Sequence, residues 1–149
     1  MKQILFFIFL FITYSVNAQN VTISNLIKLY ELDITESEEY MSKLNWNFTK
    51  NYDDDEGLTY LTFTQKDTNN NLLYLSKTYG DNKFIGMSFY SRTKKVSYIN
   101  ELKAKGFMLL DKSMDNGRIL ERYVRNEIEF TISTKPNNEY FIACGVNYN

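Results

Sequence analysis

The sequence predicts an α+β fold made of two tandem units. Each unit has a helical segment followed by a four-stranded antiparallel meander, and the helices pack on one face of the sheet. Apolar residues at helical spacing occur twice, near residues 23–44 and 96–102, and each run is followed by short segments of alternating polarity. In addition, the segment at residues 38–50 returns in looser form at residues 96–112, which indicates an internal repeat.

The first 18 residues are typical of a secretory signal peptide. A single lysine precedes the apolar run from Ile4 to Ile12, and the segment ends in Val16-Asn17-Ala18, so we expect cleavage before Gln19. An uncleaved membrane anchor is the alternative, but the run is shorter than the roughly 20 residues that span a bilayer. No cysteine lies near the cut to carry a lipid. We expect residues 19–149 to form a single exported domain, periplasmic or secreted.

The first unit, about residues 20–91, begins with two short helices. One helical face is outlined by Ile23, Leu26, Ile27 and Tyr30. Asp33 interrupts this pattern, and Thr35 and Glu38 then have the spacing of a capping box, which predicts a second helix up to residue 44. Four strands are expected at residues 46–50, 58–65, 72–79 and 83–91, joined by polar turns as in an antiparallel meander.

The second unit, residues 92–149, repeats this order. Thr93 is expected to cap a helix that carries Val96, Ile99 and Leu102 and ends at Gly106. Strands are expected at residues 107–113, 118–125, 128–134 and 140–148. The first two strands are joined through Asn116-Gly117, a dipeptide that favours tight hairpin turns.

The repeat predicts which residues are equivalent. Tyr40 matches Tyr98 and Leu44 matches Leu102. After three extra residues in the second unit, Asn45-Trp46 matches Gly106-Phe107. Further along, Gly57 matches Gly117, and Ile85 and Phe89 match Ile142 and Val146. Two such units side by side would bury more apolar surface than one marginal core.

The composition lacks several common catalytic groups. The chain has no histidine, the most common general base and metal ligand, and it has no Gly-rich phosphate loop or G-x-S-x-G motif. Its only cysteine, Cys144, lies in an apolar segment, so we expect a buried, inert thiol rather than an intermolecular disulfide. We therefore expect no enzyme, no cofactor and no metal. Catalysis by paired carboxylates, as in glycosidases, is the alternative that the composition leaves open.

Charge is unevenly divided between the two units. Residues 19–91 carry six lysines against eleven acids, whereas residues 92–149 carry ten basic and seven acidic residues. The net charge of the mature chain is close to zero, so the sequence predicts no binding of nucleic acid. The opposite charges of the units could steer a partner protein, or they could belong to two solvated surfaces.

An acidic run lies between the first two strands of the first unit. It comprises Asp53, Asp54, Asp55 and Glu56. Such carboxylates can hold calcium, but their spacing does not match a calcium-binding EF-hand loop. A solvated hairpin loop is the main interpretation, and docking to a basic partner is an alternative.

The outer face of the sheet is the candidate partner-binding surface. Alternation along the strands assigns to it Tyr60, Thr62, Tyr74, Ser76, Phe84, Ser88 and Tyr90, joined in the second unit by Glu129, Thr131, Ser133 and Phe141. Tyrosine gives a binding surface a large contact area at a small entropic cost. Tyrosine and threonine also favour strands for purely structural reasons, which is the alternative explanation.

The segment Leu26–Trp46 with its strands, and the fainter second copy, resemble the β-lactamase inhibitor proteins and the related single-unit outer-membrane assembly lipoproteins. This resemblance of pattern covers nearly the whole mature chain and implies a non-catalytic, protein-binding module. Departures are the missing lipid-bearing cysteine, the missing disulfides, Leu44-Asn45-Trp46-Asn47 in place of the usual Gly-x-Pro, and only one clear helix in the second unit.

Three functions are compatible with these observations. The first is an exported module that inhibits or neutralises another protein through the open face of its sheet. The second is an accessory subunit of an outer-membrane or cell-surface assembly, and the third is a carrier of a small apolar ligand between helices and sheet.

Overall fold

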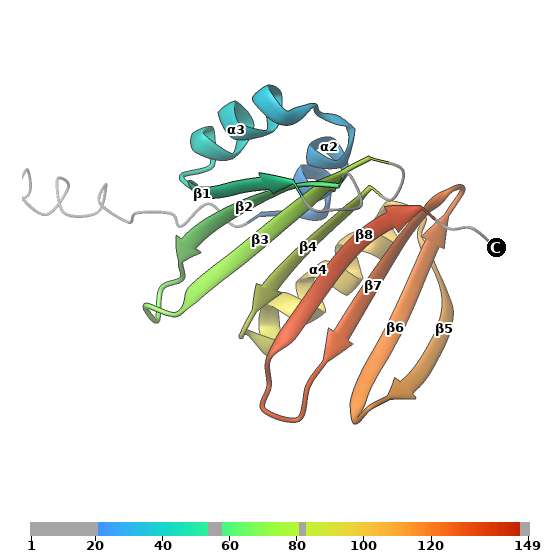
Figure 1. Ribbon diagram of the computed structural model, residues 1–149. Helices are drawn as coiled ribbons and strands as arrows, with labels where there is room; N and C mark the ends of the chain where they lie inside the picture. The colour runs from blue at the N-terminus through green and yellow to red at the C-terminus, as the bar shows by residue number, and fades with distance from the viewer. Residues whose placement is uncertain (1–20, 54–57, 81–82, 147–149) are drawn as a thin grey trace, which may run out of the picture.

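The computed structural model describes residues 21–53, 58–80 and 83–146. These form three helices and one antiparallel sheet of eight strands, which confirms the α+β class (Figure 1). The helices are α2 (Ile23–Glu31), α3 (Ile34–Lys43) and α4 (Arg92–Ala104). The strands are β1 (Asn47–Asp53), β2 (Thr59–Lys66), β3 (Leu72–Tyr79), β4 (Phe84–Phe89), β5 (Met108–Asp115), β6 (Arg118–Arg125), β7 (Ile128–Thr134) and β8 (Tyr140–Val146).

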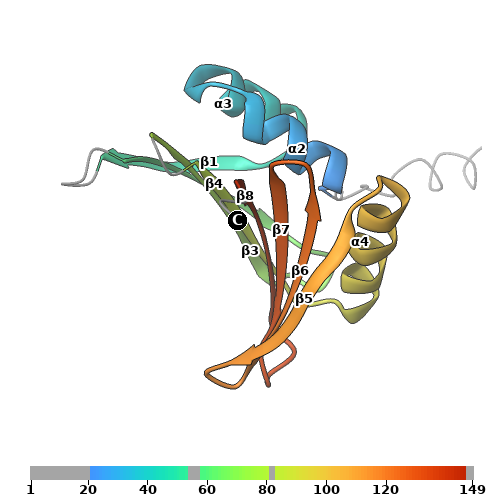
Figure 2. The same cartoon turned by 90° about the vertical axis from the view of Figure 1, so that its right-hand side faces the viewer.

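The strand order is β1-β2-β3-β4-β8-β7-β6-β5, and every neighbouring pair is antiparallel. The last strand of the chain therefore lies in the middle of the sheet beside β4, whereas β1 and β5 are its two edges. Figure 2 shows that the strand direction turns strongly from β1 to β5, with the helices on one side of the sheet. Such twist is expected from the right-handed twist of individual strands.

The helix starts differ from the predicted ones. Asp33, rather than Thr35, caps α3: its Oδ1 accepts from the Glu36 N–H at 2.8 Å, and Glu36 Oε2 accepts from the Asp33 N–H at 3.1 Å. Asp33 ends the first helical pattern and also starts the second, so α3 begins at Ile34. Ser91, rather than Thr93, caps α4 by accepting from the Lys94 N–H at 3.2 Å.

The buried face of α4 is also rotated from the predicted one. Val96 is 50% exposed, whereas Tyr98 and Leu102 are buried and Ile99 is partly buried. Tyr98 turns inward because its ring packs edge-on against Phe89 of β4 at 5.3 Å between centroids. Its hydroxyl also donates a 2.7 Å hydrogen bond to the Val21 carbonyl.

One face of the sheet supplies most of the core. Alternation along β2, β3 and β4 predicts buried side chains correctly for Leu61, Phe63, Leu73, Leu75, Ile85, Met87 and Phe89. The second half of the sheet adds Phe130, Ile132, Ile142 and Cys144 on the same face. Cys144 is a free, buried thiol as expected, and burial raises its pKa to about 12.

Lys77 continues this buried row along β3 and is fully buried. Its ammonium group donates to the carbonyls of Leu29 and Leu32 at the end of α2, and to Ser37 Oγ of α3 at 3.1 Å. A cation at a helix C-terminus interacts favourably with the free carbonyls there. Through these hydrogen bonds Lys77 connects strand β3 to the segment between α2 and α3.

Candidate functional site

The face opposite the helices, here called the open face, carries the predicted partner-binding residues of β2, β3 and β4. Register places Tyr60, Thr78 and Phe84 in one row across these strands, and Thr62, Ser76 and Gly86 in the next. Tyr74 lies opposite Thr64, and its side chain is 49% exposed. The structure thus brings six of the seven predicted residues onto one face, namely Tyr60, Thr62, Tyr74, Ser76, Phe84 and Ser88.

The middle of the open face is formed by β4 and β8. Phe84 and Phe141 stack there with ring centroids 6.2 Å apart and an interplanar angle of 25°. Both rings lie directly over Gly86, since a Cβ at that position would be 2.2 Å from Phe141 Cζ and 2.6 Å from Phe84 Cζ. The absence of a side chain at Gly86 allows the two rings to lie flat against the sheet. We call this arrangement the Phe84–Phe141 platform.

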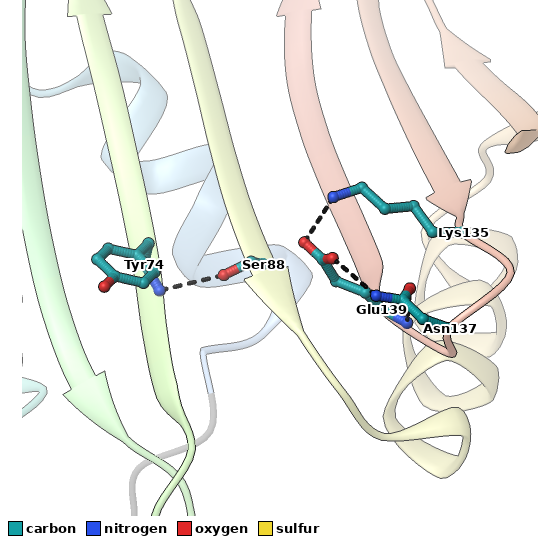
Figure 3. A network of polar contacts seen from close by, with 5 residues as sticks. All are labelled: Tyr74, Ser88, Lys135, Asn137 and Glu139. Atoms are coloured by element: carbon teal, nitrogen blue, oxygen red, sulfur yellow. Dashed lines mark hydrogen bonds and ion pairs between the residues drawn. The ribbon is translucent and has the colours of Figure 1, made fainter. Parts of the chain in front are cut away.

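Two groups of polar contacts lie between β3 and β4 and in the turn before β8 (Figure 3). The backbone N–H of Tyr74 donates to Ser88 Oγ at 3.2 Å, which ties β3 to β4 beside Phe141. In the turn before β8, Lys135 Nζ is 2.7 Å from Glu139 Oε1, and the Glu139 N–H donates to Asn137 Oδ1 at 3.2 Å. The hydrogen bond from Lys135 lowers the pKa of Glu139, so this carboxylate stays charged.

An ion pair between β6 and β7 borders the platform on the side away from β3. Arg122 donates from Nε and Nη2 to the two carboxylate oxygens of Glu129 at 2.8 and 2.7 Å. Thr131 Oγ1 donates to the same carboxylate at 3.1 Å. The hydrogen bonds from Arg122 lower the pKa of Glu129. Such a bidentate pair is geometrically fixed, so it presents a defined polar edge next to the aromatic rings.

The remaining predicted residues of the second unit divide between exposed and buried positions. Thr131 and Phe141 lie on the open face and are partly exposed, whereas Ser133 lies on the same face but is buried. Ser133 is covered because it sits between Leu120 and Phe141 in the row across β6, β7 and β8. It therefore contributes less surface than predicted.

Tyr90 does not belong to the sheet, because β4 ends at Phe89. It lines a cavity of about 520 Å³ between the β2–β3 turn and the start of α4. Hydroxyl, amide and charged side chains form much of the lining, together with apolar Leu73 and Phe89. Burial lowers the pKa of Lys94 in this lining, an effect that the nearby Asp67 opposes.

The acidic run cannot be placed as a group. Asp53 is the last residue of β1, and Asp54, Asp55 and Glu56 lie outside the described residues. Within residues 21–53, 58–80 and 83–146, no three acidic or cysteine side chains are grouped so that they could hold a metal ion.

The sequence interpretation missed Gly86, Arg122 and Lys77. Alternation along β3 does place Lys77 on the same face as Leu73 and Leu75, so its burial had a signal. The phase of β6 is ambiguous in the sequence and is fixed only by its pairing with β7, which puts Arg122 opposite Thr131. No local sequence signal distinguishes Gly86 from a glycine that merely breaks a strand.

Among the helices of the described residues, none is long and apolar enough to cross a membrane. No family model matches the chain, and neither the curated proteins nor the solved structures contain a significant match to it.

Proposed function

We propose that this chain is an exported, non-catalytic module that binds a partner protein through the open face of its sheet, as an inhibitor or immunity protein does. The observation that carries the proposal is the Phe84–Phe141 platform. Two partly exposed aromatic rings on the face away from the helices contribute little to the core, but they suit the centre of a protein interface. Tyr74, half exposed beside them, extends the aromatic surface.

We also propose that the chain consists of two equivalent units, residues 20–91 and 92–149. If Ile85 corresponds to Ile142, then Gly86 corresponds to Ala143 and Phe84 to Phe141. The observed register pairs Gly86 with Ala143, which makes the β4–β8 junction symmetric about this pair. On this interpretation the platform is formed by one phenylalanine from each unit, at the point where the units meet.

Two further features support the equivalence of the units. Register shifts occur between Phe48 and Lys50 in β1 and between Leu109 and Asp111 in β5, near the start of each edge strand. Register shifts of this kind mark a β-bulge, a feature that tends to be retained within a family.

The helices before these strands also end alike. The Trp46 N–H donates to the Met41 carbonyl, and the Phe107 N–H donates to the Leu102 carbonyl, each at 3.0 Å. The preceding residues, Asn45 and Gly106, both have positive φ. This alignment pairs Leu102 with Met41 instead of Leu44, and Tyr98 with Ser37 instead of Tyr40. It removes the three extra residues assumed from the sequence.

The test is affinity capture from the cell envelope with mature protein, residues 19–149. We expect one soluble protein to be retained at a one-to-one ratio, and Tyr74→Ala and Phe84→Ala to weaken its binding by at least about tenfold. Phe48→Ala is the matched control, because Phe48 is 46% exposed but packs against Phe63 on the helix side. Equal binding by all three variants would refute the open face as the site. Recovery of an integral membrane complex would favour the accessory-subunit function instead.

Export is part of the same proposal. The mature protein recovered from the envelope or medium should begin at Gln19, which N-terminal sequencing or intact mass can establish. A chain that retains residues 1–18 would contradict it.

The cavity beside Tyr90 is where a small ligand would bind if the chain were a ligand carrier. Its lining includes Asp67, Lys94 and Glu101, so it favours a polar ligand rather than the apolar one expected from the sequence. Native mass spectrometry of protein extracted without denaturation would reveal a bound small molecule.

A further inference from the structure

Strand β5 is an edge of the sheet with an unusual surface. It pairs only with β6, and all eight of its residues are exposed. Four of them are apolar: Met108 (72% exposed), Leu109 (52%), Leu110 (48%) and Met114 (75%). Natural edge strands usually avoid exposed apolar side chains, because the free backbone groups of an edge readily pair with another strand. A long, apolar edge therefore indicates a strand that is covered in the working protein.

The apolar side chains of β5 project from both faces of the sheet, next to the unpaired backbone edge of the strand. Met108 lies opposite Val124 on the open face, whereas Leu109 and Met114 lie opposite Tyr123 and Ile119 on the helix side. A partner that docked on one face would cover only part of this set. A strand added alongside β5 would cover side chains on both faces and would also pair the backbone.

We infer that the occupant is a second copy of this chain, whose β5 pairs antiparallel with the first about a two-fold axis. Every neighbouring pair in the sheet is antiparallel, and the β4–β8 junction already joins the two halves of the chain in the way that β5 would join two chains. This inference concerns the β5 edge of the sheet, away from the Phe84–Phe141 platform, and does not depend on the proposed partner binding.

The exposed apolar area reaches the lower limit for such a dimer. The four apolar side chains leave on the order of 500 Å² accessible on each copy, so pairing that covered them completely would bury about 1,000 Å² from them, the lower limit for a specific interface. Asp111, Lys112 and Asp115 are the charged residues of β5, so the strand carries one more acidic than basic side chain. The repulsion between two such exposed strands is small at physiological salt.

The mass in solution tests the inference. Sedimentation equilibrium of mature protein, residues 19–149, should give the mass of a dimer that dissociates on dilution. Met114→Lys and Leu110→Lys should each raise the dissociation constant of the dimer by about 100-fold. The two-fold axis repeats every substitution, so each variant buries two lysine charges in the interface. Leu72→Lys on β3 is the matched control, since Leu72 is 40% exposed and apolar, and β4, β8, β7 and β6 lie between β3 and β5 in the sheet. This variant should remain dimeric, and circular dichroism should show that all variants fold.

Cross-linking locates the interface. Because Cys144 is 1% exposed, a new cysteine would be the only accessible thiol. A short bifunctional maleimide should link Ser113→Cys, in β5, into dimers but leave Ser42→Cys, on the exposed side of α3, monomeric. A wild type that is monomeric at all concentrations, or equal cross-linking at both positions, would overturn the inference. So would open-ended polymers, or a β5 that pairs only with a different protein.

Discussion

Replacing Gly86 by alanine tests the Phe84–Phe141 platform directly. The new methyl carbon would be placed 2.2 Å from Phe141 Cζ and 2.6 Å from Phe84 Cζ. Both distances are far below van der Waals contact, so the rings must move off the sheet. The backbone of β4 is held between β3 and β8 and has little freedom to move instead.

The expected cost follows from the surroundings of the two rings. Overpacking a closed core typically costs about 1–3 kcal/mol, but these rings face solvent and can swing outward, which places the steric cost near the lower limit. Separating a stacked aromatic pair costs a further 0.5–1.5 kcal/mol, roughly. We therefore expect Gly86→Ala to lower the free energy of unfolding by about 2 kcal/mol and the Tm by about 6–10 °C for a domain of this size.

Gly145→Ala is the matched control on the neighbouring strand. Its Cβ would meet only the Lys83 carbonyl oxygen, at an ordinary distance of 3.7 Å. Thermal unfolding should show an unchanged or slightly raised Tm for Gly145→Ala, because alanine loses less backbone entropy than glycine in a strand. Partner binding should fall in Gly86→Ala and persist in Gly145→Ala. Equal Tm values for the two variants would refute the packing of the rings on Gly86.

Three other substitutions test individual contacts. Burial lowers the pKa of Lys77 from 10.5 to about 8, so between these pH values the unfolded chain binds more protons and the free energy of unfolding rises with pH. Denaturant unfolding at pH 7 and 9.5 should show this rise in the wild type and a smaller rise in Lys77→Met, which keeps the contribution of the partly buried Lys94; equal pH dependence of the two proteins would contradict it. Tyr98→Phe should cost about 1–2 kcal/mol in urea unfolding, since it leaves the buried Val21 carbonyl without its donor, and no loss would argue against that bond. Asp33→Ala should cost about 1 kcal/mol through loss of the α3 cap, whereas Thr35→Ala, the cap expected from the sequence, should be nearly neutral.

Local patterns predicted much of the fold. Alternation identified the strands and their buried faces, because a side-chain period of two has only one phase that buries both Leu61 and Phe63 of β2, and only one that buries both Leu73 and Leu75 of β3. The helix caps were misplaced by two residues, since Asp33 and Thr35 both precede acidic residues at capping-box spacing. Which of the two caps the helix depends on where the chain leaves α2, and that is a tertiary property.

The centre of the candidate site could not be deduced in the same way. Phe84 and Phe141 are 57 positions apart, and each was assigned to the outer face separately. Their contact depends on the β4–β8 register, which pairs Gly86 with Ala143. Strand pairing between distant segments leaves no local signal in either segment, so a single sequence predicted the residues but not the platform that they form.

The two proposed surfaces have a joint consequence that neither has alone. A two-fold axis perpendicular to the sheet would keep the open faces of both copies on the same side of one continuous sheet, because pairing along β5 does not turn either copy over. A dimer would then present two platforms to the same side, and a surface crowded with partner molecules would be bound bivalently. Wild-type protein should therefore dissociate from densely immobilised partner more slowly than Met114→Lys, while both bind soluble partner with equal affinity. A Met114→Lys variant that also loses affinity for the soluble partner would show instead that β5 itself belongs to the partner-binding surface.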